Sequence, residues 1–193
     1  MGRLAFSLAA LSLALAFGPG SGRPAAAEPQ AGSWSVYFSP HGGCTEAVVR
    51  ALAGAKTTVL VQAYSFTSAP IAGALVDAHK RGVKVEAVLD KSNLTERYSS
   101  ADFLAHMGIP TKIDSVHAIA HNKVMVIDGE TVITGSFNFT KAAEEHNAEN
   151  LLIIHDKDLA ARYAANWQAH AAHSEPYTGE RSSPPHHRHR RAK

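Results

Sequence analysis

Polar residues stand at the ends of two neighbouring apolar segments in the stretch HNKVMVIDGETVITGSFN, residues 121–138. The stretch begins with His121 and Lys123 and ends with Ser136 and Asn138. Residues two apart on a strand face the same side, so the side chains of His121 and Lys123 project together. Imidazole is a good nucleophile near neutral pH, and ammonium and amide groups stabilise negative charge on oxygen. This set of side chains suits nucleophilic attack on a phosphodiester.

Two carboxylates lie at or near the ends of these predicted strands. Asp128 and Gly129 form a strong hairpin-turn signal between the two apolar segments. Pairing across this turn brings residues 134–138 back alongside residues 120–124. Glu149 opens the next apolar strand, which would place it at the border of this patch. In other histidine sites a carboxylate partner holds the ring in the tautomer that catalysis needs.

A purely structural interpretation of these residues remains open at this point. Lysine is common at strand edges, Asp-Gly is common in turns, and serine or asparagine often caps a helical turn. The residue types alone favour an active site and a capped hairpin about equally.

The full pattern resembles the signature of the phospholipase D superfamily. It reads His121-x-Lys123, four residues, Asp128, six residues, and then Gly135-Ser136-Phe137-Asn138. The segments 65–75, 81–92 and 135–152 look like the small bacterial endonuclease branch, so the resemblance covers roughly residues 34–170. In the commonest form of the signature the asparagine lies three residues after the serine. Here it lies two after, as in that endonuclease branch.

The resemblance implies a role for each residue of the pattern. His121 is the nucleophile that forms a phosphohistidine, and Glu149 orients it. Lys123, Ser136 and Asn138 bind the phosphate, and Asp128 is chiefly a structural support. The family needs two signatures for each active site, whereas this chain has one. The resemblance therefore implies a homodimer with the active site at its two-fold interface, which also places nucleophile and general acid on opposite sides of the phosphorus.

A metal centre is the competing interpretation, because the chain has twelve histidines. Those of the central region show no spacing of a recognised zinc motif. His170 and His173 lie three apart on one helix face, and we interpret them as a surface pair. His117 lies in a predicted substrate loop, and we interpret it as an ordinary loop histidine rather than one that contacts substrate. We expect no metal and no cofactor.

Strands and helices alternate along the central region. Apolar periodicity predicts strands at 34–39, 57–66, 83–90, 110–113, 123–128, 131–135 and 149–155. Helices are predicted at 45–55, 68–81, 101–107 and 159–171, with a short helical turn at 140–145. Strand, helix, strand order requires a right-handed crossover between parallel strands. The predicted fold is α/β, with a mixed, mostly parallel sheet flanked by helices.

Three segments differ in composition. Residues 1–27 have the charged start, apolar run and small-residue end of a signal peptide, which predicts a periplasmic or secreted protein with no integral membrane segment after cleavage. Residues 28–173 form the predicted phosphodiesterase domain. Residues 174–193 are polar, basic and rich in histidine, which predicts a disordered tail.

The net charge of +2 does not describe the domain. Of 19 basic residues, two lie in residues 1–27 and five in 174–193; two of the 17 acidic residues also lie in 174–193. The domain therefore carries 12 bases and 15 acids, and a polyanion would need a local positive patch. The one cysteine, Cys44, is interpreted as a small, partly buried side chain; a bond between subunits is the alternative.

Three functions follow from these observations. The first is a non-specific endonuclease acting on DNA or RNA. The second keeps the chemistry and replaces nucleic acid with phospholipid, as in a phospholipase D. The third is a non-catalytic nucleic-acid-binding protein, which the intact His121, Lys123 and Asn138 disfavour because a binding protein needs no nucleophile.

Overall fold

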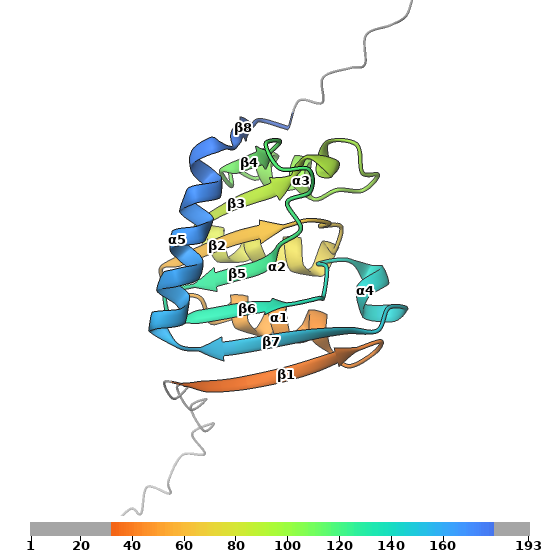
Figure 1. Ribbon diagram of the computed structural model, residues 1–193, viewed down its shortest axis with the longest axis vertical. Helices are drawn as coiled ribbons and strands as arrows, with labels where there is room; N and C mark the ends of the chain where they lie inside the picture. The colour runs from red at the N-terminus through yellow and green to blue at the C-terminus, as the bar shows by residue number, and fades with distance from the viewer. Residues whose placement is uncertain (1–31, 180–193) are drawn as a thin grey trace, which may run out of the picture.

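The protein is built on one mixed eight-stranded sheet with the strand order β1-β7-β6-β5-β2-β3-β4-β8 (Figure 1). The computed structural model describes residues 32–179. The predictions for residues 1–27, and for most of the tail, lie outside this range. The strands are β1 (Ser33–Ser39), β2 (Thr58–Ala63), β3 (Lys84–Asp90), β4 (Thr111–Asp114), β5 (Lys123–Ile127), β6 (Thr131–Gly135), β7 (Glu149–His155) and β8 (Glu175–Tyr177).

Helices cover both faces of the sheet. They are α1 (Cys44–Ala53), α2 (Ala69–Lys80), α3 (Ala101–His106), α4 (Lys141–Glu145) and α5 (Lys157–His173), with a short 3-10 turn η1 at Lys91–Leu94. Figure 1 shows α5 crossing the near face of the sheet, with α1 and α2 behind it. The main hydrophobic core lies between the sheet and α1 and α2. Strand β2 is nearly continuously apolar because both of its faces are covered.

The prediction of an α/β fold with a mixed sheet is confirmed, but its "mostly parallel" part is wrong. Only β2 with β3 and β3 with β4 pair in parallel, while the other five pairings within residues 32–179 are antiparallel. The physical reason lies in the connections. A helix joins β2 to β3, and another helix lies between β3 and β4, which gives parallel crossovers. A tight turn joins β5 to β6, and reversal after such a short link makes the strands antiparallel.

The ordered domain extends past the boundary that composition predicted. Residues 174 onward were assigned to the tail, yet Glu175–Tyr177 pair with β4 as strand β8. Composition misses this strand because it is only three residues long and gains its stability from β4 rather than from its own pattern. Lys112 and Ser174 help to hold it in place: Lys112 Nζ donates to the Ala171 carbonyl at 2.7 Å, and the Ser174 hydroxyl donates to the His170 carbonyl at 2.7 Å.

The strand register aligns one edge of the sheet. Asp114 pairs with Asp90, Leu89 pairs with Ala63, and Ala63 pairs with Lys123. The ends of β2, β3 and β4 therefore lie on the same edge as the start of β5. Gly135, the last residue of β6, pairs with Leu151 near the start of β7 and continues this edge. None of the helices between residues 32 and 179 is long and apolar enough to cross a membrane.

Candidate active site

His121 and Lys123 lie together at this edge of the sheet. His121 is exposed in the loop that leads into β5, whereas Lys123, the first residue of β5, is buried. The Lys123 ammonium donates a hydrogen bond of 2.9 Å to the His121 carbonyl oxygen. The ring of Tyr64 packs against both residues: its centroid lies 4.6 Å from that of the His121 ring and 5.1 Å from Lys123 Nζ. Tyr64 thus forms one wall of the site.

Burial tunes the charge of Lys123. Removal from water lowers the pKa of its ammonium below the ordinary lysine value, while the carboxylate of Glu149 acts in the opposite direction. Glu149, the first residue of β7, is therefore near enough to Lys123 for its charge to affect the lysine pKa. A weakly solvated cation stabilises a nearby anion more strongly than a cation in bulk water does.

The hairpin of β5 and β6 runs back toward the start of β5, as the sequence predicted. Met125 pairs with Ile133 and Ile127 with Thr131. When this register is continued by two residues, Gly135 at the end of β6 lies opposite Lys123.

Two buried phenylalanines fix the orientation of the segment after β6. Phe137 and Phe139 are fully buried, and the Phe139 carbonyl accepts hydrogen bonds of 3.0 and 2.9 Å from the amides of Thr67 and Ser68. The alternating residue Ser136 is therefore exposed and Asn138 is half-buried. The anchoring of one set of side chains determines that the other set faces the site.

Gly135 permits a close approach that any other residue would block. Its φ is +147°, and a Cβ at this position would lie 2.3 Å from the Asn150 carbonyl oxygen. Because β6 and β7 meet so closely here, the Asn150 amide donates to the Ser136 hydroxyl at 3.1 Å. The glycine of the signature is thus required by backbone packing, and it places Ser136.

Asn138 retains unused hydrogen-bonding capacity. Its side-chain oxygen is buried but has no hydrogen-bond partner within residues 32–179. A buried polar atom without a partner costs free energy, so such atoms are rare outside functional sites. This oxygen can accept a hydrogen bond from a ligand that enters the site, and a donor to a phosphate would be the NH₂ group of the same amide.

Glu149 does not hydrogen-bond to His121 in this chain. Its carboxylate accepts a hydrogen bond of 3.1 Å from the Asn147 side chain. Across the described part of the chain, the imidazole of His121 has no hydrogen-bond partner and its ring contact is with Tyr64. The orienting role of Glu149 stays a prediction.

Asp128 acts on the backbone, away from the other residues of the pattern. It occupies the turn between β5 and β6 with a φ of +55°. Its carboxylate accepts hydrogen bonds from the amides of Lys56, Thr57 and Thr58 and from the Thr57 hydroxyl, at 2.7–2.9 Å. Burial would raise the pKa of Asp128, but these hydrogen bonds outweigh it and lower that pKa. Asp128 therefore ties the hairpin to the segment that leads into β2.

Cys44 is fully buried at the start of α1 and forms no disulfide. Burial, followed by the nearby Glu144, raises the pKa of its thiol to about 11. A buried, protonated thiol suits packing and not a bond between subunits.

A second cluster of side chains contradicts the sequence interpretation of three histidines. His117, His170 and His173 converge on the buried carboxylate of Asp114. His170 and His173 are therefore not an ordinary surface pair, and His117 is not an isolated loop histidine. The available signal was two pairs with the same spacing, Asp114-x-x-His117 and His170-x-x-His173. Only the fold shows that the pairs meet.

The first cluster has the chemistry of phosphoryl transfer. It combines an exposed imidazole, a buried ammonium, a hydroxyl and an uncommitted amide at one edge of the sheet. An imidazole can attack phosphorus, and cationic and amide groups stabilise the charge that develops on the nonbridging oxygens.

This chain matches one family model and is similar to proteins with named activities. A family model described as cardiolipin synthase, PLD-like domain, matches residues 48–171. A phospholipase D of Rickettsia felis is 47% identical over 133 residues, which make up 69% of this chain and 66% of that protein. A mitochondrial cardiolipin hydrolase of Xenopus laevis is 31% identical over 117 residues, covering 61% of this chain and 56% of that protein. The matched region is thus just under two thirds of the rickettsial protein's length.

A solved structure shows the same architecture. Nuc from Salmonella typhimurium, described as a phospholipase D family member, superposes with a TM-score of 0.73 at 42% sequence identity. The match covers 75% of this chain and 97% of that chain.

Proposed function

Because the chain belongs to the family of phospholipase D-like domains, we propose that it hydrolyses phosphodiester bonds in nucleic acid through a phosphohistidine intermediate on His121. The observation that carries this proposal is the gathering of His121, Lys123, Ser136 and Asn138 at one edge of the sheet. Within this group the imidazole of His121 and the side-chain oxygen of Asn138 have no hydrogen-bond partner in the described chain.

The proposed reaction has two steps. A nitrogen of the His121 imidazole attacks phosphorus, and the bond from phosphorus to the leaving oxygen breaks as that oxygen takes a proton from a general acid. Lys123 and Asn138 stabilise the charge on the nonbridging oxygens, and the Ser136 hydroxyl donates to the phosphate. A water molecule then attacks phosphorus, gives its proton to the former acid, and releases His121. Glu149 is proposed to stabilise the cationic form of the nucleophilic ring.

The general acid is proposed to come from a second copy of the chain. No other histidine contacts the ring of His121 within residues 32–179. In a symmetric dimer, His121 of the partner subunit supplies the missing acid from the opposite side of the phosphorus. The loop before His121 presents apolar side chains that a second copy would cover: Val116 is 68% exposed and Ile119 is 56% exposed. Ile119→Asp should yield a monomer in sedimentation and lose activity; an active monomer would contradict the shared site.

Nucleic acid is favoured as substrate by an exposed pair in the loop that follows η1. The guanidinium of Arg97 lies 4.9 Å from the centroid of the Tyr98 ring, which is highly exposed. This loop is tied to the wall of the site, because Asn93 donates to the Tyr64 carbonyl at 2.6 Å. An aromatic ring with a stacked cation binds unpaired bases. The Arg97→Ala/Tyr98→Ala variant should bind DNA more weakly while it still cleaves a small phosphodiester such as bis(p-nitrophenyl) phosphate.

Phospholipid is the second candidate substrate. The rickettsial relative named a phospholipase D is 47% identical, a closer match than Nuc at 42%. The third candidate, a nucleic-acid-binding protein without catalysis, requires that no substrate be cleaved.

One experiment separates the three candidates. The purified protein is incubated with plasmid DNA, RNA and phosphatidylcholine vesicles, with EDTA present, at a temperature at which circular dichroism shows a folded chain. We expect cleavage of the nucleic acids and none by His121→Ala. The matched control is His106→Ala, which removes an exposed histidine at the end of α3, away from the site. Cleavage of the vesicles alone would favour the lipid reaction, and cleavage of no substrate would leave the binding protein. Loss of cleavage in EDTA would contradict metal-free chemistry if a variant without the histidine cluster, His117→Gln/His173→Gln, lost it as well.

We also propose that residues 1–27 direct export to the periplasm or the medium. The support is their sequence pattern. N-terminal sequencing of the exported protein should begin near Glu28, and retention of Met1 in the cell interior would refute the proposal.

A further inference from the structure

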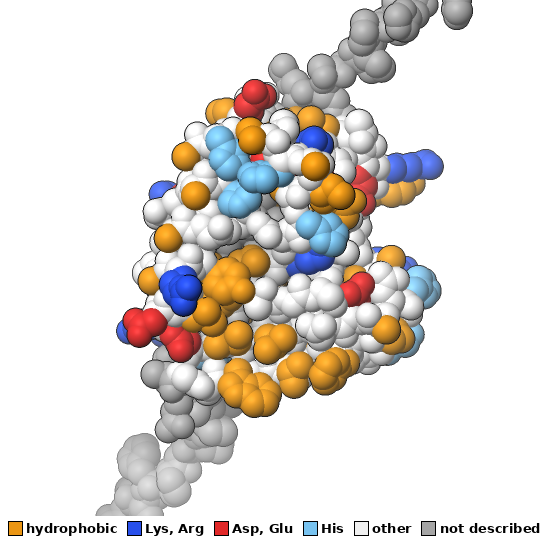
Figure 2. Space-filling view, viewed as in Figure 1, with side chains coloured by type: hydrophobic (Ala, Val, Ile, Leu, Met, Phe, Trp, Pro, Cys, Tyr) orange, Lys and Arg blue, Asp and Glu red, His pale blue; other side chains and the backbone are white. Residues whose placement is uncertain are grey.

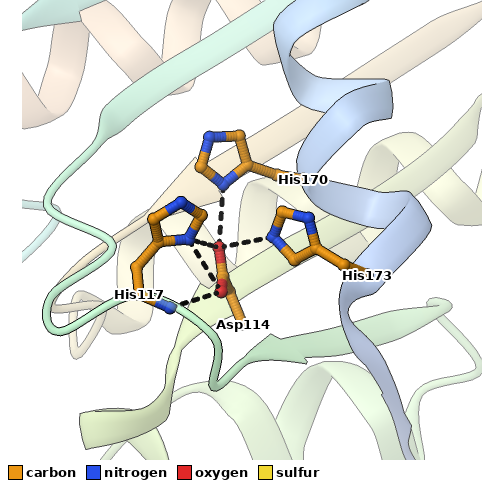
Figure 3. Close-up of side chains that lie close together, drawn as sticks. All are labelled: Asp114, His117, His170 and His173. Carbon is orange, nitrogen blue, oxygen red and sulfur yellow. Dashed lines mark hydrogen bonds and ion pairs between the residues drawn. The ribbon is translucent and has the colours of Figure 1, made fainter.

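Three histidines and one aspartate form a compact cluster away from the proposed active site. Asp114 ends β4, His117 follows it in the next loop, and His170 and His173 occupy the last turn of α5. Figure 3 shows the three imidazoles pointing at one carboxylate, and histidine side chains gather on the corresponding face in Figure 2. The cluster therefore joins a strand end, a loop and a helix end that are distant in sequence.

The nitrogen atoms converge on one oxygen atom of Asp114. Oδ2 lies 2.9 Å from His117 Nδ1, 2.8 Å from His170 Nδ1 and 3.3 Å from His173 Nε2. The other oxygen, Oδ1, lies 3.1 Å from His117 Nδ1 and accepts hydrogen bonds from the backbone amides of Val116 and His117 at 3.2 and 3.4 Å. These amides fix the carboxylate and leave Oδ2 directed at the histidines. Outer hydrogen bonds of this kind commonly orient the ligands of a metal ion.

The cluster is compact enough for its four ligand atoms to surround a single ion. The three imidazole centroids lie 4.8–5.3 Å from one another, and the four ligand atoms all lie within 4.8 Å of one another. In a tetrahedral zinc site with bonds of about 2.0–2.1 Å, neighbouring ligand atoms are separated by about 3.3 Å. The three distances from Oδ2 already match this edge, so modest ring movements would complete the tetrahedron.

We propose that Asp114, His117, His170 and His173 bind one divalent transition-metal ion, with Zn²⁺ as the preferred ion. Imidazole nitrogen suits zinc and its neighbours in the first transition row, whereas Mg²⁺ and Ca²⁺ require mostly oxygen ligands. Asp114 is fully buried, and a buried carboxylate needs a positive partner. The histidine side chains are 16–43% exposed, which leaves a path for an ion from solvent.

The ion would have a structural role, distinct from phosphodiester cleavage. Four protein ligands fill a tetrahedron and leave no open position for a reacting water. Three strand spacings separate Asp114 from Lys123 in the sheet, which is about 14 Å.

The site nevertheless reaches the loop that carries His121. The His117 carbonyl accepts a hydrogen bond of 2.8 Å from Lys91, and the Ala120 amide donates to Asp90 at 2.7 Å. With His117 held by the ion, the loop would be anchored at His117 and at Ala120, the residue before His121. Binding of the ion would thus join the end of α5, β4 and the loop before the active site.

Metal content and affinity test the proposal directly. The protein is purified without an affinity tag, stripped with a chelator, and titrated with Zn²⁺ in competition with a chromophoric chelator. We expect one tight ion per chain. The variant His117→Gln/His173→Gln should lose more than the roughly 10–100-fold in affinity that removal of an outer hydrogen-bond partner costs. Co²⁺ should give the intense visible spectrum of a tetrahedral complex with the unaltered protein but not with His117→Gln/His173→Gln.

The controls separate this site from adventitious binding. The C-terminal sequence HHRH could bind metal by itself, so His186→Ala/His187→Ala/His189→Ala should retain the tight ion. Zn²⁺ should raise the unfolding temperature of that variant, but not that of His117→Gln/His173→Gln. Both replaced side chains are partly exposed, so the substitutions should preserve the fold, which circular dichroism checks. Absence of a stoichiometric ion, or equal affinity in the two sets of variants, would overturn the proposal.

Discussion

Replacement of Asp128 should reduce stability and leave catalysis intact. The carboxylate accepts four hydrogen bonds at 2.7–2.9 Å, and three of them come from the backbone that leads into β2. The site is partly exposed, so water replaces part of each lost bond, and a net value of about 0.5 kcal/mol each is appropriate. The left-handed backbone, with φ of +55°, adds about 1 kcal/mol for alanine. Asp128→Ala should therefore destabilise by about 3 kcal/mol.

Asparagine provides the matched comparison. It tolerates the left-handed conformation and keeps one acceptor oxygen, but it loses the acceptor for the Lys56 amide and the charge. Asp128→Asn should cost about 1 kcal/mol. With a urea m-value of about 2 kcal/mol/M, the unfolding midpoint should fall by about 1.5 M for alanine and about 0.5 M for asparagine.

The pH dependence of these differences has a definite sign. The hydrogen bonds lower the pKa of Asp128 in the folded state, against the effect of burial. The stabilisation is therefore fully present above the unfolded-state pKa of about 3.9, and it is lost as the pH falls through the folded-state value. The stability gap between the unaltered protein and Asp128→Ala should narrow in acid.

Catalytic measurements decide whether this reasoning is correct. At temperatures where both variants are folded, kcat for DNA cleavage should stay within a few-fold of the unaltered protein. A variant with unchanged unfolding midpoint and a kcat reduced by about 100-fold or more would refute the structural role.

Three further predictions concern Lys123, Gly135 and the C-terminal tail. Because burial lowers the pKa of Lys123, activity should fall as the pH rises through a value below that of an ordinary lysine; Lys123→Arg, which stays charged, should lose this alkaline limb in a pH–rate profile. Gly135→Ala should destabilise by about 2–4 kcal/mol in urea unfolding, since its Cβ would meet the Asn150 carbonyl, whereas Gly129→Ala, with open space, should cost about 1 kcal/mol. Deletion of residues 180–193, which spares β8, should weaken DNA binding and flatten its salt dependence with the chemistry intact; an unchanged slope would exclude the tail from binding.

The proposed active site was predictable because its parts are close in sequence. His121, Lys123, Ser136 and Asn138 belong to one hairpin whose turn is announced by Asp128 and Gly129. Two-residue periodicity and a tight turn fix which residues come together without knowledge of the remaining fold. The same local patterns predict the positions of the strands and most of the helices.

The direction of strand pairing was harder to predict. Whether β5 lies antiparallel to β2 depends on where the chain returns to the sheet, which periodicity does not encode. The burial of Lys123 depends likewise on packing around Tyr64 and the neighbouring strands, so its altered pKa could not be derived from the residue type.

The sequence by itself determined the hairpin that begins beside His121 and Lys123, because a hairpin needs only neighbouring residues to assemble it. The tertiary structure alone decided that Asp114, His117, His170 and His173 form one cluster. His170 and His173 lie 56 and 59 residues from Asp114, and they meet it because α5 crosses the sheet and ends over β4. Spacing along the chain reveals each pair of ligands, but only the path of α5 over the sheet brings the two pairs to the same carboxylate.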